Sequence, residues 1–491
     1  MIGARRRRVA VAVAVLAFGG CAVNPVTHRP ELAIVSQSTE LELGARQAKT
    51  VRDEMGLVAE GTLTAYVRRV GDRLAAQSPR TDVPYAFHVV DTPEPNAFAI
   101  PGHVYVTRGM LALLNDEDEL ASVLAHEVGH IAARHAVQRL SRALPAGILT
   151  GVVSGVTGMA SPLLGSLFQA GGSLATEALL APYSREQERE ADRVGQEIAA
   201  RAGWDPAALA RSLDTLERVE RIGAEPRRRP SFLDSHPTTP ERAQATAAYA
   251  ATLARGARPA DAAAPPDFLG HLDGLVVGRA AAQGVFVETT FLHPDLAFHL
   301  RFPEGWQTEN GASYVAGATR DGTIGMIVTV AASGDDPAAG VRAFEKEVGQ
   351  PLLTRVERTT IGGLAAAHMS GSAESGDRRI AVELWWVAIA GRVFRLTGIA
   401  PARADVAHRG TLAAVAATFG PLTAEERASI TERRLRLQEG RPGETVTAFA
   451  IRTRTPWKPA LVAVANGLAA DATVPTDRPL KVARTEVFDP R

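Results

Sequence analysis

The sequence predicts a multidomain α+β protein, and two observations lead to this prediction. Residues 22–254 are dominated by apolar residues at helical spacing, with only short alternating runs between them, which indicates a mostly helical domain with a small β-sheet. From Val285 onward alternating runs of strand type prevail, after a stretch rich in Ala, Pro and Arg. The predicted divisions are a leader at 1–20, a helical domain at 21–254, a linker at 255–284, an α+β domain at 285–420 and a small β-α-α-β unit at 432–487.

The charge and composition of the chain argue against a nucleic-acid-binding protein and against a disordered protein. The 491 residues include 54 basic and 54 acidic residues, so the formal net charge is zero and nothing in it favours nucleic acid as a partner. Because 46% of the residues are hydrophobic, the chain can build cores and does not have the composition of a disordered protein.

The first 21 residues resemble the leader of a bacterial lipoprotein. A basic run, Arg5–Arg8, is followed by an apolar stretch, Val9–Gly20, that is too short to span a bilayer comfortably. Two glycines then precede Cys21, the only cysteine in the sequence, as in a lipobox, although Phe18 stands where leucine is usual. The resemblance implies lipid attachment at Cys21, and the alanine after it implies the outer membrane. The alternative is an ordinary signal peptide with an incidental cysteine.

Periodicity predicts the following elements. The helical domain has predicted helices from Ser38 and over Thr62–Gln77, Asn115–Leu144, Tyr183–Ala200, Pro206–Ile222 and Glu241–Leu253, and strands at Tyr85–Val90, Ala97–Ile100 and His103–Thr107. The second domain has predicted strands at Leu296–Phe302, Thr323–Ala331, Ala381–Ile389 and Arg392–Ile399, and helices at Pro337–Val348 and Arg403–Thr418. Residues 144–182 are apolar and rich in glycine. We expect close-packed helices there, and a flap that touches a membrane is the alternative.

One predicted helix carries a His-Glu-x-x-His motif. Asp116 can cap this helix, with Glu119 three residues later. His126 and His130 are four residues apart, so both imidazoles project from one helix face and can bind one metal ion. Glu127 lies beside them, where a general base for metal-assisted hydrolysis would stand. The pattern is typical of zinc peptidases, although these residue types also meet by chance on polar helix faces.

A catalytic zinc site needs a third protein ligand and an open position. The candidates lie on a later helix, where Glu188 and Asp192 are four residues apart and share a face. One carboxylate can then bind the metal while the other orients a ligating histidine. Glu186 and Glu190 are alternatives. Taken alone, the run is equally typical of a solvated, charged helix.

Together the two motifs resemble the HtpX-type and BepA-type zinc metallopeptidases, a gluzincin family with a zincin-like fold. The matching segments, within roughly 21–255, are Asn24–Thr27, Asn96–Phe98, Tyr105–Gly109, His126–His130, Arg134-His135, and Ser184-Arg185 with Glu188 and Ala191-Asp192. The resemblance implies one Zn²⁺ per chain, held by His126, His130 and Glu188. It also implies Glu127 as the catalytic base and Asp192 as a supporting residue.

A further resemblance concerns His236. The run Ser235-His236-Pro237 is similar to a loop of the periplasmic members in which the histidine can reach the metal. His236 would then be a fourth ligand at rest or would stabilise the oxyanion. A loop histidine without a role is the alternative.

The family resemblance implies a zinc-dependent endopeptidase of the bacterial envelope. It would be lipid-anchored in the periplasm, and its substrates would be unfolded or misassembled envelope proteins. An extended substrate would add as a strand at the Ala97–Thr107 edge. Two alternatives stay open: a chaperone or assembly factor for outer-membrane proteins that cleaves rarely, and a peptidoglycan-binding scaffold whose peptidase half is gated shut.

The C-terminal segment resembles a LysM module. Its predicted β-α-α-β order spans Leu437–Val487, and Pro442–Val446, Val464–Leu468 and Leu480–Val482 carry the likeness. This implies peptidoglycan as a further partner, and a generic capping subdomain is the alternative. The domain at 285–420 has only scattered histidines, which favour structural roles, and we derive no function for it.

Overall fold

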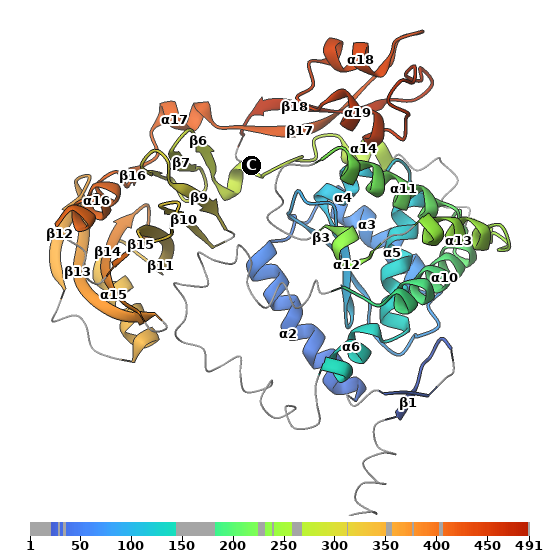
Figure 1. The fold of residues 1–491 in the computed structure, drawn as a ribbon, viewed down its shortest axis with the longest axis horizontal. Helices are drawn as coiled ribbons and strands as arrows, with labels where there is room; N and C mark the ends of the chain where they lie inside the picture. Colours follow the sequence, from blue (N-terminus) through green and yellow to red (C-terminus); the bar gives the residue numbers. More distant parts are fainter. Residues whose placement is uncertain are drawn as a thin grey trace, which may run out of the picture. The chain divides into compact units, whose positions relative to one another are not determined.

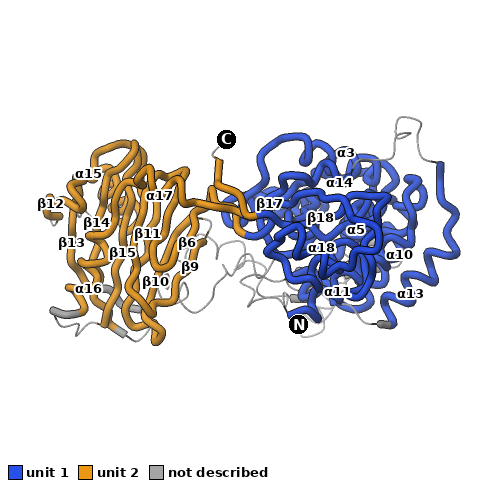
Figure 2. Tube along the Cα trace, turned by 90° about the horizontal axis from the view of Figure 1, so that it is seen from above, with its two compact units in different colours: residues 1–154, 174–278, 433–484 blue, residues 155–173, 279–432, 485–491 orange. Residues whose placement is uncertain are grey.

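The computed structural model divides into two compact units (Figure 2). Unit 1 takes residues 1–154, 174–278 and 433–484, and unit 2 takes 155–173, 279–432 and 485–491. The structure describes residues 21–27, 30–32, 36–143, 182–223, 231–237, 240–257, 268–311, 313–349, 356–375, 378–401 and 406–489. The predicted leader at 1–20 and the apolar segment up to residue 181 lie outside these residues. None of the described helices combines the length and the apolar content needed to cross a membrane.

Unit 1 is mostly helical and carries a small sheet, so the predicted multidomain α+β architecture is confirmed. Its helices are α2 (Gln37–Met55), α3 (Thr62–Ala75), α4 (Arg108–Leu113), α5 (Glu117–Ala132), α6 (His135–Ala143), α10 (Arg185–Arg201), α11 (Ala208–Arg221), α12 (Phe232–Ser235), α13 (Pro240–Ala250), α14 (Phe268–Leu272), α18 (Val446–Thr453) and α19 (Pro459–Ala465) (Figure 1). Its strands are β1 (Cys21–Val23), β2 (Pro30–Leu32), β3 (Ala86–Val90), β4 (Ala97–Ile100), β5 (His103–Thr107), β17 (Thr431–Gln438) and β18 (Leu480–Val487). In the three-stranded sheet β3 runs parallel to β5, and β4 pairs antiparallel on the other side of β5. Among the described strands β4 is therefore an edge, and it packs beside α5.

Helix α5 is the central element of unit 1 and is buried along its length. Its N-terminus is capped by Asp116, whose side chain accepts a hydrogen bond of 2.7 Å from the backbone N–H of Glu119. Glu117 in the first turn accepts hydrogen bonds from Tyr66 and Trp204, at 2.6 Å and 2.9 Å. The start of this helix is thus stabilised both by its local cap and by hydrogen bonds from residues distant in the sequence.

Two glycines let α10 lie directly against α5 (Figure 1). A Cβ atom on Gly195 of α10 would lie 2.8 Å from the backbone nitrogen of His126, and one on Gly129 of α5 would lie 2.9 Å from the carbonyl oxygen of Ala191. Real Cβ contacts are longer than this, so the backbones can approach only because both residues lack a side chain. The close approach brings the acidic face of α10 to the motif on α5.

The prediction of one helix over 115–144 is wrong, because the helix breaks at Arg134. This residue has φ +57°, a conformation that is uncommon for a residue other than glycine. The guanidinium of Arg134 donates to the carboxylate of Glu40 at 3.1 Å, and Arg80 binds the same buried carboxylate at 2.8 Å. This cluster, drawn from distant parts of the chain, offsets the backbone cost of the break.

The segment 433–484 belongs to unit 1 and does not stand apart as the small domain predicted at 432–487. Its β-α-α-β order is the predicted one, with β17 paired to β18. Leu435, Ala465 and Ala483 join the core of unit 1. Lys481 is fully buried and donates a 2.5 Å hydrogen bond to the carbonyl of Leu114, just before the cap of α5. Burial lowers the pKa of Lys481 to about 7.

The predicted linker at 255–284 also differs from the structure. Phe268, Leu272 and Leu275 are buried in the core of unit 1. A β-bridge joins Val276 to Arg434, at the point where the chain leaves this unit and returns to it. Residues 268–278 are therefore part of the unit and do not form a linker.

Unit 2 is built on sheets, and its longest part, residues 279–432, lies in the sequence between residues 174–278 and 433–484 of unit 1. A seven-stranded sheet has the order β12 (Glu357–Ile361), β13 (Leu364–Ser375), β14 (Arg378–Ile389), β15 (Arg392–Pro401), β11 (Gly325–Ser333), β10 (Tyr314–Ala318), β9 (Gln307–Asn310). A four-stranded sheet has the order β16 (Gly420–Pro421), β8 (Phe298–Arg301), β7 (Thr290–His293), β6 (Val285–Val287). The helices are α15 (Pro337–Val348), α16 (Val406–Ala417) and α17 (Ala424–Ser429), with a 3₁₀ turn η2 (Ala281–Gln283). The four predicted strands and two predicted helices are present, whereas the shorter strands and β13 were not predicted.

Candidate metal centre

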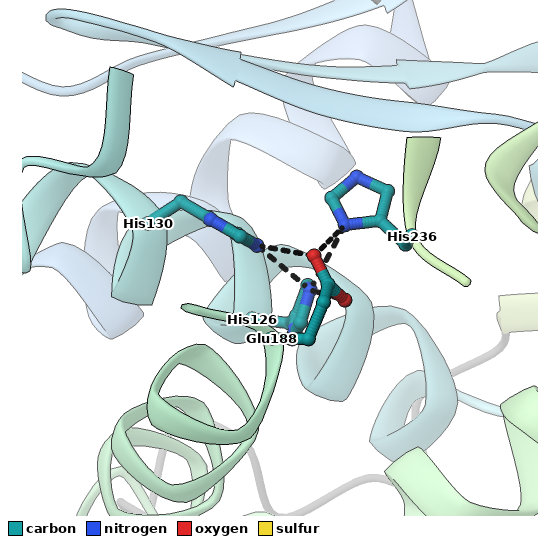
Figure 3. Close-up of side chains that lie close together, drawn as sticks. All are labelled: His126, His130, Glu188 and His236. Atoms are coloured by element: carbon teal, nitrogen blue, oxygen red, sulfur yellow. Dashed lines mark hydrogen bonds and ion pairs between the residues drawn. The ribbon is translucent and has the colours of Figure 1, made fainter. Parts of the chain in front are cut away.

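Four buried side chains from three parts of unit 1 converge on one point (Figure 3). His126 and His130 come from α5, Glu188 from α10, and His236 from the residue that ends α12. One ligand atom of each lies within 4.8 Å of the others. The Nε2 atoms of the two α5 histidines are 3.0 Å apart, and Nδ1 of His236 lies 2.9 Å from Oε1 of Glu188. The structure thus brings the three predicted ligands together and adds the fourth residue of the sequence analysis.

The residues present fit a zinc ion. Imidazole nitrogens and a carboxylate oxygen are ligands that zinc prefers in proteins, and three or four of them suffice. The neighbouring carboxylate of Glu127 is fully buried, and neither of its oxygens has a hydrogen-bond partner among the described residues. Its Oε1 atom lies 3.6 Å from Nε2 of His236, which is also buried and has no hydrogen-bond partner in the described part of the chain. Buried polar atoms are rarely left in this way in proteins, and those that are often mark a catalytic or ion-binding site.

Two charged side chains, Asp192 and Arg242, contact the residues of the cluster. Oδ1 of Asp192 lies 3.0 Å from Nδ1 of His126, the ring nitrogen that faces away from the cluster. Arg242 of α13 binds both oxygens of Asp192 at 2.7 Å, and its third nitrogen lies 2.7 Å from Oε2 of Glu188. The same guanidinium donates to the carbonyl of His236 at 3.3 Å. One arginine therefore fixes the second predicted carboxylate, the third ligand and the loop histidine relative to one another.

The local electrostatics give these groups distinct protonation tendencies. Burial raises the pKa of Glu127, because desolvation penalises its charged form. Burial alone would also raise the pKa of Glu188, but the imidazoles of His236 and His130 hold it well below its usual range. Burial lowers the pKa of His130 well below the ordinary histidine value. The two glutamates are thus biased in opposite directions, one toward proton acceptance and the other toward a permanent charge.

The alternative ligands on α10 lie away from the cluster. Glu186 is exposed. Glu190 accepts a hydrogen bond from the side chain of Asn24 at 3.0 Å and lies 3.3 Å from Nε2 of His135. Cys21, the predicted lipid attachment site, lies in β1 opposite Leu32 of β2.

Sequence reasoning gave no role to three residues that support the site. Arg242 forms its bonds only because α13 packs against α10, which no local pattern in the sequence indicates. The ring of Tyr183 stacks on His130 with centroids 4.0 Å apart, and the ring of Phe232 stacks on His236 at 4.3 Å. The only sequence signal was that each aromatic residue lies close to a motif.

The sequence is similar to a family of metallopeptidases and to two curated metalloproteases. A family model described as peptidase family M48 matches residues 62–250. The mitochondrial metalloendopeptidase OMA1 of Schizosaccharomyces pombe is 33% identical over 222 residues, which are 44% of this chain and 63% of that protein. The beta-barrel assembly-enhancing protease of Escherichia coli K12 is 28% identical over 245 residues, which are 48% of this chain and 50% of that protein. A crystal structure from Bacteroides thetaiotaomicron aligns with 41% of this chain and 89% of its own, at 14% identity and a TM-score of 0.25. The chain thus spans about half to two thirds of the length of the two curated relatives.

Proposed function

Because residues 62–250 form a domain of peptidase family M48, we propose that the chain is a zinc-dependent endopeptidase of the bacterial cell envelope. Its proposed substrates are unfolded or misassembled envelope proteins, so that its role is quality control. The observation that carries the proposal is the convergence of His126, His130 and Glu188 within 4.8 Å, with the buried Glu127 beside them. The names of the two curated relatives, a metalloendopeptidase and an assembly-enhancing protease, support the same activity.

The proposed mechanism gives each residue one task. When bound by His126, His130 and Glu188, a zinc ion would polarise the substrate carbonyl and lower the pKa of a water toward about 7. Glu127 takes the proton of the attacking water and passes it to the leaving amine. Because burial raises the pKa of Glu127, this carboxylate is a better proton acceptor near neutral pH than an exposed glutamate. Asp192 holds the ring of His126 so that Nε2 faces the cluster.

The edge strand β4 offers a place for the substrate backbone. β4 pairs only with β5 among the described strands, and it packs beside the motif helix α5. An extended peptide that pairs with this edge gains main-chain hydrogen bonds whatever its sequence. Such binding suits an enzyme that acts on many unfolded chains.

The cellular setting is proposed from the two ends of the sequence. We propose that Cys21 carries a lipid anchor, that the chain lies in the periplasm, and that the anchor holds it to the outer membrane. We also propose that the LysM-like segment 437–487 binds peptidoglycan. The β-α-α-β order of this segment supports the second proposal.

The test compares the wild type with Glu127→Gln. Both proteins are assayed for zinc per chain and for digestion of casein, with and without a zinc chelator. We expect one zinc in both proteins, digestion only by the wild type, and loss of that digestion with the chelator. Digestion that survives in Glu127→Gln would contradict the assignment of the base.

One observation favours a second candidate function. His236 adds a fourth protein donor within the cluster, and closed four-ligand zinc sites are structural and not catalytic. A chain that keeps His236 in place would hold outer-membrane proteins as an assembly factor and cleave them rarely. Suppression of aggregation by Glu127→Gln at the wild-type level, with negligible wild-type digestion, would favour this candidate.

A further inference from the structure

The segment that follows Cys21 is bonded to α10, the helix that carries the ligand Glu188. The side chain of Asn24 is buried, and its Oδ1 atom accepts hydrogen bonds from the backbone of Val26 at 2.8 Å and of Thr27 at 3.1 Å. These bonds make a tight local turn. They leave the Nδ2 group of Asn24 to donate to Oε1 of Glu190 at 3.0 Å. A residue three positions after the cysteine thus binds the helix that carries Glu188.

Glu190 connects this turn to a ligand. Its second oxygen, Oε2, lies 3.3 Å from Nε2 of His135. The other nitrogen of that ring, Nδ1, lies 2.9 Å from Nδ1 of His130. The Nε2 atom of His130 faces the cluster, so its Nδ1 is the nitrogen left for support from outside.

The donors and acceptors along this path alternate without conflict. With Nε2 of His130 directed at the metal, its Nδ1 carries the proton and donates to Nδ1 of His135. Nε2 of His135 then carries a proton and donates to Glu190, and Glu190 accepts a second bond from Asn24. Hydrogen bonds of this kind fix the tautomer and the ring orientation of a metal-binding histidine.

The helix break at Arg134 is what makes the path possible. In a continuous helix, a residue five positions after His130 would point well away from it, since each residue turns the helix by about 100°. The left-handed conformation at Arg134 turns the chain, and the buried ring of His135 comes to lie beside His130.

We propose that the segment Cys21–Thr27 is a positioning element of the metal centre, which acts through Asn24, Glu190 and His135 on His130. The proposal rests on the zinc site of the proposed function. It assigns no catalytic role to these residues, because none of them reaches the reacting atoms. It makes the attachment of the N-terminal segment and the affinity for zinc interdependent.

The test measures zinc affinity in the full chain by competition with a chromophoric chelator. His135→Ala and Glu190→Gln should each weaken zinc binding by about 10–100-fold, the range for residues that support a ligand. Asn24→Asp is the most specific variant. It keeps the oxygen that forms the turn, but it replaces the donor with an oxygen facing a carboxylate, and we expect a smaller loss than for His135→Ala. The matched control is Glu186→Gln on the same helix, which should bind zinc as the wild type does.

Two further readouts separate positioning from stability. In Asn24→Asp and His135→Ala, the thermal midpoint should fall further below wild type in the zinc-loaded protein than in the metal-free protein. The double variant Asn24→Asp/His135→Ala should lose no more zinc affinity than His135→Ala alone, because both residues act along one path. Wild-type zinc affinity in His135→Ala and Asn24→Asp would overturn the proposal, as would equal losses of midpoint with and without zinc. If His126→Ala and wild type bind zinc alike, the proposed function itself fails.

Discussion

The Nδ1 atom of His126 lies 3.0 Å from Oδ1 of Asp192, on the side of the ring opposite to the metal cluster. Asp192→Asn keeps the size of this side chain but removes the charge that holds the imidazole. We expect zinc affinity to fall about 10–100-fold in chelator competition. Asp214→Asn, at an exposed carboxylate, serves as the control and should have no effect. Wild-type affinity in Asp192→Asn would show that the carboxylate supports only Arg242.

Removal of a ligand and removal of the base should have different effects. His126→Ala, His130→Ala and Glu188→Ala each take away one of three protein ligands, so we expect each variant to lose zinc. Glu127→Gln removes the proton acceptor and should keep zinc while losing turnover. Metal analysis beside a proteolysis assay checks both. A Glu188→Ala protein that still holds one zinc per chain would overturn the choice of third ligand.

His236→Ala distinguishes two roles for the loop histidine. Nδ1 of His236 lies 2.9 Å from Glu188 and 3.3 Å from Nε2 of His126, which places it among the ligands. We therefore expect its removal to raise the rate of casein digestion, since water and substrate no longer compete with His236 for the fourth position at the metal. A loss of about 10²–10³ in turnover would indicate instead that it stabilises the oxyanion. An unchanged rate would leave it without a role in the reaction.

The contact between α5 and α10 should not tolerate a methyl group. A Cβ atom on Gly195 would meet the backbone of His126 at 2.8 Å, so Gly195→Ala must push the helices apart. We expect a loss of stability of about 1–3 kcal/mol and weaker zinc binding. Gly410→Ala, in α16 with nothing within 4 Å, is the matched control. It should be neutral or stabilising by up to about 1 kcal/mol, since alanine favours helices. Equal thermal midpoints for the two variants would contradict the prediction.

Lys481 should make the free energy of unfolding depend on pH between about 7 and 10.5. Burial lowers its pKa from 10.5 to about 7, although Glu119 and Asp116 act in the opposite direction and Arg478 acts with the burial. Between these two pH values the unfolded chain binds the extra proton, so the free energy of unfolding should rise with pH across this window and level off below it. The total change should be on the order of a few kcal/mol.

Urea unfolding across the same pH range provides the measurement. Lys481→Met should flatten the slope between pH 7 and 10.5. Lys458→Met, at an exposed lysine, should leave the slope as it is in the wild type. A wild-type slope in Lys481→Met would assign the pH dependence to other groups.

The sequence predicted the parts of the site that depend on local pattern. The cap at Asp116 and the i, i+4 spacing of His126 and His130 are properties of a single helix, and the structure contains that helix. The strands β4 and β5 also have the predicted bounds, because a Pro-Gly turn separates two apolar runs.

The parts that it missed depend on residues distant in the sequence. The break at Arg134 requires a carboxylate from Glu40, 94 positions away. The role of Arg242 becomes visible only when α13 lies against α10, which sets its guanidinium on Asp192. The burial of Lys481 also has no signal in the sequence, since lysine is almost never fully buried unless it is paired. No local sequence pattern indicates such contacts.

The chain leaves unit 1 after Gly278 and re-enters it at Arg433. Just before the exit, the N–H of Val277 donates a 2.8 Å hydrogen bond to the carbonyl of Arg433. Synthesis must therefore pass through all of residues 279–432 before the strand that receives this bond exists. Until then the core lacks Leu435 and Ala483, and the turn before α5 lacks the bond from Lys481. The core around α5 is consequently complete only after the residues up to 484 have been made. Truncation before residue 433 should therefore leave the core around α5 incomplete, although all residues of the candidate metal centre would be present.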